Sequence, residues 1–280
     1  VASPSPIAST RDLATGALTL SQTLIDGVGG VSGIPSMSDI VISPDGAHLY
    51  EVGASGAARY VTAFARDPVT GLLTFAGSVA NPGAATGYLV VAVSGDGANV
   101  YATGLEDDVL TVYERNAGTG LLTELQTMRN GVAGVTNLAR PIGLSVSPDG
   151  ATVVVSSSAD ATRKLLAFRR NLGDGTLTFV EDAGPAYGPN AFAVDGTRVF
   201  DNQYATSLRV FALDPATSLL NPEETVSTAG MTGNSNVAVS PDGQHVYVSS
   251  IAQAGTQASV VVLRVACGNG AVENGEACDD

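Results

Sequence analysis

Acid–base chemistry would first be sought at the two histidines of this chain, His48 and His245. Each stands two residues after a glycine, at the start of an expected strand, and the two positions are equivalent in a repeat. Equivalent positions indicate a feature of the repeat, so we expect both histidines to have a structural role beside a turn. The sequence gives no support for a Ser-His-Asp triad.

The most regular polar residues are five aspartates that stand in turns. One interpretation makes them a ring of ligands. We favour the other, in which each carboxylate accepts hydrogen bonds from its own tight turn, because such turns lie too far apart to share an ion. These structural turn residues are Asp45, Asp96, Asp149, Asp195 and Asp242.

Polar loops that precede the third strand of each repeat are the remaining place for a binding site, because they meet at one mouth of the expected channel. Loop charge that only contacts solvent is the favoured interpretation. If these loops bind a cation or a sugar, the candidate residues are Glu106, Asp107, Asp108, Asp201 and Tyr204, and Glu51 and Arg59 flank a further such loop. Hydrolysis at this mouth would need a base or metal to activate water and a cation to stabilise the oxyanion, and we assign neither role to a residue.

The C-terminal segment 267–280 differs in composition from the rest. Cys267 and Cys278 enclose ten residues, many of them Gly or Asn, so we expect a local disulfide; two thiols alone are half of a structural zinc site. Four side chains offer the oxygen ligands that Ca²⁺ prefers, although no EF-hand spacing is present. They are Glu273, Glu276, Asp279 and Asp280.

The elements that position these residues follow from a repeated turn. Ser-Pro-Asp-Gly occurs at 43–46, 147–150 and 240–243, with degraded copies at 94–97 and 193–196. The five aspartates are 51, 53, 46 and 47 residues apart, a period that indicates a propeller or another repeat array. In the first complete repeat we predict strands at 39–43, 47–52, 60–66 and 72–79.

A second turn signature alternates with the first, at 67–71, 116–120, 171–175 and 214–218. Four-stranded antiparallel units of this length are propeller blades. We therefore predict an all-β propeller of five blades over residues 1–266, followed by the partial cysteine-rich tail 267–280. Residues 11–16 match the second turn, so we expect strand 17–24 to complete the last blade, 236–265, and close the ring.

Both signatures resemble the lactonase-like propeller superfamily with YVTN-type repeats, over residues ~11–266. The resemblance rests on segments 64–68, 146–150 and 242–248, and it implies the fold more than the activity. Lactonases of this superfamily usually have seven blades, so five is a departure. The tail resembles the start of a cysteine-rich repeat common in large surface proteins of myxobacteria and related bacteria.

Composition limits the partners. Asp and Glu outnumber Lys and Arg by 27 to 13, with a pI near 4.3, which disfavours nucleic acid and anionic lipid. No apolar run reaches the ~18–20 residues of a membrane span, so we expect no direct membrane insertion. The first 266 residues contain no cysteine, which fits an extracellular or cell-surface location, with the periplasm as the alternative.

The sequence alone therefore favours a non-enzymatic, secreted or cell-surface propeller module of a longer bacterial protein. Its expected partners are a surface protein or carbohydrate, and neighbouring copies for self-assembly. The scarcity of His and the small, neutral loops between repeats, such as 81–87, support this hypothesis over an enzyme. The alternative is a lactonase-like hydrolase with its site at the channel mouth, and the third hypothesis is a Ca²⁺-binding surface module.

Overall fold

The computed structural model describes residues 4–34, 37–55, 58–80, 90–106, 108–158, 163–186, 188–203, 207–228, 234–250, 258–265 and 272–273. Every regular element in these ranges is a β-strand. None of the described segments is a helix of the length and hydrophobicity needed to cross a membrane.

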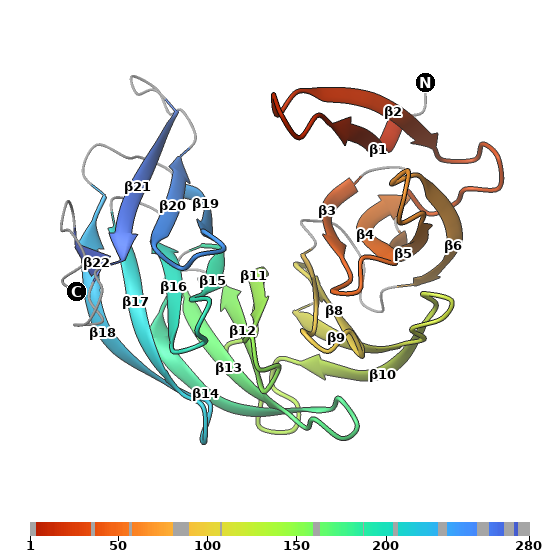
Figure 1. The fold of residues 1–280 in the computed structure, drawn as a ribbon. Coiled ribbons are helices and arrows are strands. Elements are labelled where there is room, and N and C mark those ends of the chain that lie inside the picture. The colour runs from red at the N-terminus through yellow and green to blue at the C-terminus, as the bar shows by residue number, and fades with distance from the viewer. Residues whose placement is uncertain are drawn as a thin grey trace. The chain divides into compact units, whose positions relative to one another are not determined.

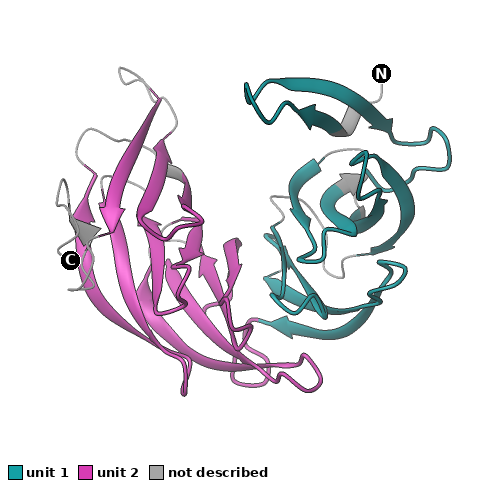
Figure 2. Ribbon diagram, in the orientation of Figure 1, with its two compact units in different colours: residues 1–129 teal, residues 130–280 magenta. Residues whose placement is uncertain are grey.

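The strands form five four-stranded antiparallel blades of a β-propeller, which confirms the predicted fold class (Figure 1). Two blades and one hairpin belong to a first compact unit, residues 1–129 (Figure 2). The hairpin is β1 (Pro4–Arg11) and β2 (Leu18–Ile25). Blade one is β3 (Met37–Ile42), β4 (His48–Ser55), β5 (Ala58–Arg66) and β6 (Leu73–Ala80). Blade two is β7 (Val91–Val93), β8 (Asn99–Gly104), β9 (Val109–Arg115) and β10 (Leu122–Arg129).

Three blades belong to the second unit, residues 130–280. Blade three is β11 (Pro141–Val146), β12 (Thr152–Ser157), β13 (Lys164–Arg170) and β14 (Leu177–Pro185). Blade four is β15 (Asn190–Phe192), β16 (Arg198–Gln203), β17 (Ser207–Asp214) and β18 (Leu219–Ser227). Blade five is β19 (Asn234–Val239), β20 (His245–Ser250), β21 (Ser259–Val265) and β22 (Val272–Glu273).

Turn chemistry explains why the strands begin and end where they do. In blade one the Gly46 amide donates to the Ser43 carbonyl at 2.8 Å, and Gly46 has φ = +67°, a conformation that glycine adopts without steric cost. The second turn is held by Asp67, whose Oδ1 accepts from the amides of Val69 and Thr70 at 2.9 and 2.7 Å. Both turns therefore fix strand ends through local contacts.

Each unit buries its apolar side chains between neighbouring blades. In the first unit one cluster joins blades one and two and includes Tyr50, Val61 and Val100, all fully buried. In the second unit one cluster joins blades three and four around Leu165 and Phe211. Another cluster joins blades four and five around Phe200, Val248 and Leu263. Packing of sheet on sheet is therefore the main source of stability.

At the two ends of the chain, the strand pairings differ from those expected from the sequence. β2 pairs with β1, and this hairpin has the second turn signature, with Asp12 accepting from the amides of Ala14 and Thr15. The fourth strand of blade five is β22, which lies inside the segment predicted as a separate tail and pairs with β21. Closure of the ring by residues 17–24 stays a prediction.

Candidate functional site

The structure places the predicted mouth residues on different elements. Glu106 and Asp108 lie in the short connection between β8 and β9, where Asp108 has φ = +53°. Asp201 lies inside β16 and is fully buried. Asp107 and Tyr204 lie outside the described residues. The acidic connection belongs to the first unit and Asp201 to the second.

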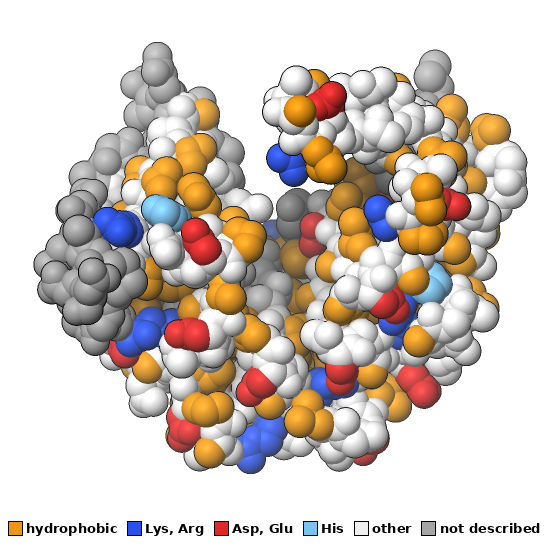
Figure 3. Space-filling model, in the orientation of Figure 1, with side chains coloured by type: hydrophobic (Ala, Val, Ile, Leu, Met, Phe, Trp, Pro, Cys, Tyr) orange, Lys and Arg blue, Asp and Glu red, His pale blue; other side chains and the backbone are white. Residues whose placement is uncertain are grey.

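Most of the residues predicted as a tail site lie outside the described residues. Glu273 lies in β22, but its side chain is outside the described part, as are Cys267, Cys278, Glu276, Asp279 and Asp280. Among the residues that the structure describes, no group of three His, Cys, Asp or Glu side chains is placed to hold a metal ion. On the face drawn in Figure 3, acidic and basic side chains are interspersed. The disulfide and the Ca²⁺ site stay predictions.

The turn aspartates accept hydrogen bonds within their own turns. Asp45 Oδ1 accepts from the Ser43 hydroxyl at 2.5 Å and from the Ala47 amide at 3.0 Å. In the fourth blade Asp195 Oδ1 accepts from the amide and hydroxyl of Thr197 at 2.9 and 2.8 Å. The same bond to the amide two residues ahead occurs at Asp96, Asp149 and Asp242.

His48 lies in a buried network centred on Arg115, at the turn end of blades one and two. Arg115 Nη2 lies 2.7 Å from His48 Nδ1 and 2.7 Å from Asp45 Oδ2, and Nε donates to the Tyr50 hydroxyl at 2.9 Å. Burial, reinforced by the positive charge of Arg115, lowers the pKa of His48. His245 is half-buried in β20, with its ring centroid 6.3 Å from that of Tyr247.

Asp201 takes part in a polar network between blades three and four. Its Oδ1 accepts from the Ser156 hydroxyl at 3.3 Å, and the Gln203 amide nitrogen donates to Oδ2. Ser156 in turn accepts from Asn190 Nδ2 at 2.6 Å. Arg209 stands opposite Asp201 on β17, donates to the Pro185 carbonyl at 2.8 Å and lies over the Phe211 ring. This group combines a carboxylate, hydroxyl and amide groups and a cation.

Glu51 is the second buried carboxylate, on β4 of the first blade. Its side chain is fully buried, and neither carboxyl oxygen has a hydrogen-bond partner among the described residues. It pairs across the sheet with Thr62, whose hydroxyl donates to the Gly33 carbonyl at 3.1 Å. Burial, with a smaller contribution from the negative charge of Asp26, raises the pKa of Glu51 to about 7.

Glu51 and Asp201 occupy equivalent positions, three residues after His48 and Arg198, which begin the second strands of their blades. A carboxyl group with a pKa near 7 can both accept and donate a proton at neutral pH, as general acid–base catalysis requires. The predicted strand 47–52 contains Glu51 and was expected to end beside a loop; β4 continues to Ser55, so Glu51 lies well inside the strand. The available signal was a single acidic residue inside an otherwise apolar strand, visible once the repeats are aligned.

Residues 7–136 match the family model described as "Lactonase, 7-bladed beta-propeller". The matched segment contains most of the hairpin, blade one with Glu51, and blade two. A comparison with the curated proteins found no match.

Solved structures agree with the fold. A "putative 6-phosphogluconolactonase" from Bacteroides uniformis is similar with a TM-score of 0.77 at 19% identity, over 95% of this chain and 76% of that one. A periplasmic gluconolactonase from Pseudomonas aeruginosa is similar with a TM-score of 0.62 at 25% identity, over 79% of this chain and 63% of that one. The chain thus has the β-propeller fold, and its residues 7–136 are similar to the lactonase family.

These likenesses correct the functional prediction made from the sequence. The match to the lactonase family model contradicts a non-enzymatic module for adhesion or assembly and supports the alternative, a lactonase-like hydrolase. The prediction was wrong because it treated the scarcity of His as evidence against catalysis. A buried carboxyl group such as Glu51 can perform proton transfer without histidine.

Proposed function

We propose that this protein is a lactonase-like hydrolase that opens a sugar lactone, with Glu51 as the general base. The observation that carries the proposal is Glu51 itself, a buried carboxyl group without a described partner and with a pKa of about 7. It lies in the segment that matches the lactonase family model. The substrate class is taken from the gluconolactonase named among the similar structures.

In the proposed reaction the ionised Glu51 accepts a proton from a water molecule, and the water oxygen forms a bond to the lactone carbonyl carbon. The bond between that carbon and the ring oxygen then breaks. The ring oxygen receives the proton from Glu51 and becomes the hydroxyl of the hydroxy acid. Atoms balance with one water consumed, and the carboxyl group returns to its starting state.

The test is hydrolysis of D-glucono-δ-lactone by the wild type and by Glu51→Gln, followed by a pH indicator or by NMR. Removal of a general base is expected to lower kcat/KM by about 10²–10⁴-fold. The wild type should gain activity as pH rises through about 7, because only the ionised carboxylate accepts a proton. Rates have to be corrected for spontaneous opening of the lactone.

Glu114→Gln is the matched control, because Glu114 is an exposed glutamate on β9 of the same unit. It should retain wild-type activity. Asp201→Asn tests the equivalent carboxylate in blade four and should affect the rate less than Glu51→Gln. Full activity of a folded Glu51→Gln variant would contradict the assignment of the base. A location outside the cytoplasm and Ca²⁺ binding by the tail remain proposals from the sequence.

A further inference from the structure

An arginine ends the third strand in three of the five blades and binds the first turn of its own blade. In each case Nη1 donates to the carbonyl of the turn glycine, at 3.0–3.4 Å. The pairs are Arg66 with Gly46, Arg115 with Gly97, and Arg170 with Gly150.

Arg115, at the end of the third strand of blade two, also binds groups of the preceding blade. Besides its bond to Gly97, its guanidinium donates to the Asp45 carboxylate and to the Tyr50 hydroxyl of blade one. The Arg115 side chain is only 1% exposed. A guanidinium group therefore fills the turn end of the junction between these two blades.

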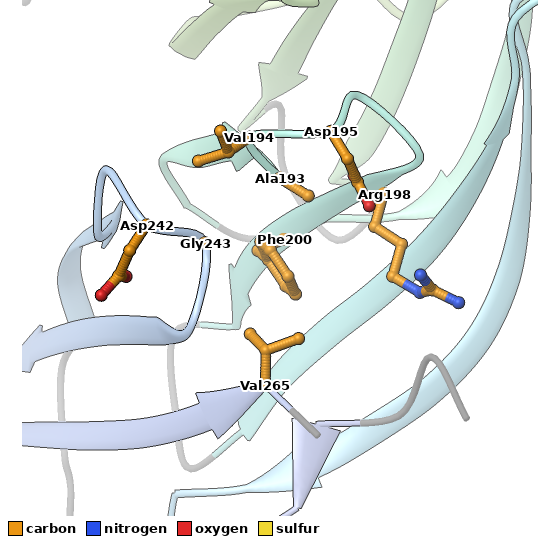
Figure 4. Close-up of a pocket in the computed structure, with 8 residues that line it drawn as sticks. All are labelled: Ala193, Val194, Asp195, Arg198, Phe200, Asp242, Gly243 and Val265. Atoms are coloured by element: carbon orange, nitrogen blue, oxygen red, sulfur yellow. The ribbon is translucent and has the colours of Figure 1, made fainter. Parts of the chain in front are cut away.

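Blade five has a valine at this position. Arg264 pairs with His245 and Val265 follows it, just as Glu114 pairs with Asn99 and Arg115 follows. A pocket of about 280 Å³ lies beside Val265, at the turn end of the junction with blade four (Figure 4). Its lining residues are Ala193, Val194, Asp195, Arg198, Phe200, Asp242, Gly243 and Val265.

The pocket has counterparts of two acceptors of Arg115, the turn carboxylate and the turn glycine carbonyl, while Arg198 stands at the position of His48. By position in the repeat, Asp195 corresponds to Asp45, Phe200 to Tyr50 and Gly243 to Gly97. Both hydrogen bonds that Asp195 accepts from the described residues end on Oδ1, so Oδ2 is available to a cation.

Two other charged residues line the pocket. Arg198 is paired with Glu223, with Nε 2.7 Å from Oε2, so its charge is countered outside the pocket. The Asp242 side chain points away from Phe200 and Val265 (Figure 4). Asp195 is therefore the charged group that remains for a ligand.

We propose that this pocket binds an alkylguanidinium group in the place of the missing arginine. The guanidinium would donate to Asp195 and to the Gly243 carbonyl, and the Phe200 ring and Val265 would contact its flat face and alkyl chain. The volume lies just below the range of small-molecule sites, about 300–1,000 Å³, which suits a group of this size.

The first experiment titrates the protein with n-butylguanidinium and with n-butylammonium, and monitors the Val265 methyl and Gly243 amide NMR signals. Saturable shifts with the guanidinium, at least tenfold tighter than with the ammonium, are expected, because only the guanidinium offers a planar set of donors. Free alkylguanidines and arginine side chains share this group. If Nα-acetyl-L-arginine amide binds more tightly than n-butylguanidinium, the natural ligand is an arginine side chain of a peptide. If it binds equally or more weakly, the natural ligand is a free alkylguanidine.

Variants test the residues. Asp195→Asn keeps an oxygen that accepts from Thr197 but removes the charge, and should weaken binding at least tenfold. Asp149→Asn makes the same change in the equivalent turn of blade three and should leave binding intact. Val265→Arg should abolish binding and raise Tm, because the guanidinium of the new side chain would occupy the pocket. Val265→Leu is the control: its larger side chain fills part of the pocket without a charge, so it should only weaken binding. Absence of saturable shifts at millimolar ligand, or unchanged affinity in Asp195→Asn, would overturn the proposal.

Discussion

At the scale of single residues, Glu51 is a fully buried carboxyl group whose oxygens have no hydrogen-bond partner among the described residues. A carboxylate without hydrogen bonds is costly to bury, so the folded protein favours the protonated form, and the negative charge of Asp26 adds to this preference. The pKa of about 7 that results is useful to a hydrolase and has a cost in stability at neutral pH.

Glu51→Gln should therefore remove a pH dependence of stability. Below about pH 4.5 the carboxyl group is protonated in both the folded and the unfolded chain. Between pH 4.5 and about 7 only the unfolded chain releases the proton, so the wild type loses stability as pH rises; above 7 this loss is complete. Relative to the wild type, the free energy of unfolding of the variant should increase by up to about 3 kcal/mol between pH 4.5 and 8, as measured by urea unfolding.

The exposed Glu114→Gln should show no comparable gain over the same pH interval. A constant difference in unfolding free energy between Glu51→Gln and the wild type would mean that the pKa of Glu51 is not raised. That result would also remove the main physical reason for choosing Glu51 as the base.

Little of this site could be predicted from the sequence. Turn aspartates are visible because their chemistry is local, and Asp201 was named, but as a loop residue. The raised pKa of Glu51 depends on its burial in the folded chain and on the negative charge of Asp26, which is distant from it in the sequence. An acidic residue in a predicted strand does not show from the sequence whether its side chain is buried. The hydrogen bonds between Arg115 and the residues around His48 could not be predicted either, because they depend on contact between two blades.

At the scale of elements, the sequence predicted the blades well because turns fix the strands locally. The expected strands at 39–43, 47–52, 60–66 and 72–79 agree within a few residues with β3, β4, β5 and β6. The pairing of β1 with β2 and of β22 with β21 was missed. β1 has no turn signature before it, and β22 is only two residues long, so neither gives a periodic pattern.

The hairpin should depend on Gln22 for its attachment to blade one. Gln22 Nε2 donates to the Leu73 carbonyl at 2.8 Å, and Gln22 Oε1 accepts from the Leu73 amide at 2.8 Å. Gln22→Leu would leave both backbone groups without these partners, at a cost of about 1–3 kcal/mol. We expect faster hydrogen exchange at the Leu73 amide and along β2, measured by NMR.

Thr19→Ala is the comparison, because Thr19 is an exposed residue of the same strand. It should change exchange at Leu73 little. Equal protection of the Leu73 amide in Gln22→Leu and the wild type would show that packing around Leu24 and Phe75, rather than this pair of bonds, holds the hairpin.

At the scale of the whole molecule, the dominant electrostatic property is a formal net charge of −14 at pH 7. The described ion pairs Arg115–Asp45, Lys164–Asp182 and Arg198–Glu223 each neutralise one carboxylate, and most of the 27 acidic residues have no basic counterpart in the composition. Net charge of this size destabilises the compact state by self-repulsion.

Added salt should therefore stabilise the protein at pH 7. The Debye length falls from about 30 Å at 0.01 M to about 8 Å at 0.15 M, so repulsion between separate surface carboxylates is screened. A gain of 1 kcal/mol corresponds to about 2–4 °C in Tm for a chain of 150–250 residues, and a rise of this order is expected between 10 mM and 200 mM NaCl. Circular dichroism melts at both salt concentrations measure it.

Melting curves at a second pH, and with Ca²⁺ in place of NaCl, distinguish screening of charge repulsion from binding of a specific cation. Near pH 4.3, where the net charge approaches zero, the effect of NaCl should largely disappear, since there is no excess repulsion to screen. Ca²⁺ at matched ionic strength adds a second comparison at pH 7. Because a ligand of the folded state stabilises it by mass action, a rise in Tm beyond that with NaCl would support a cation site in the acidic tail, and equal curves would oppose it. A fall in Tm on adding NaCl at pH 7 would instead mean that attractive ion pairs outweigh the excess of negative charge.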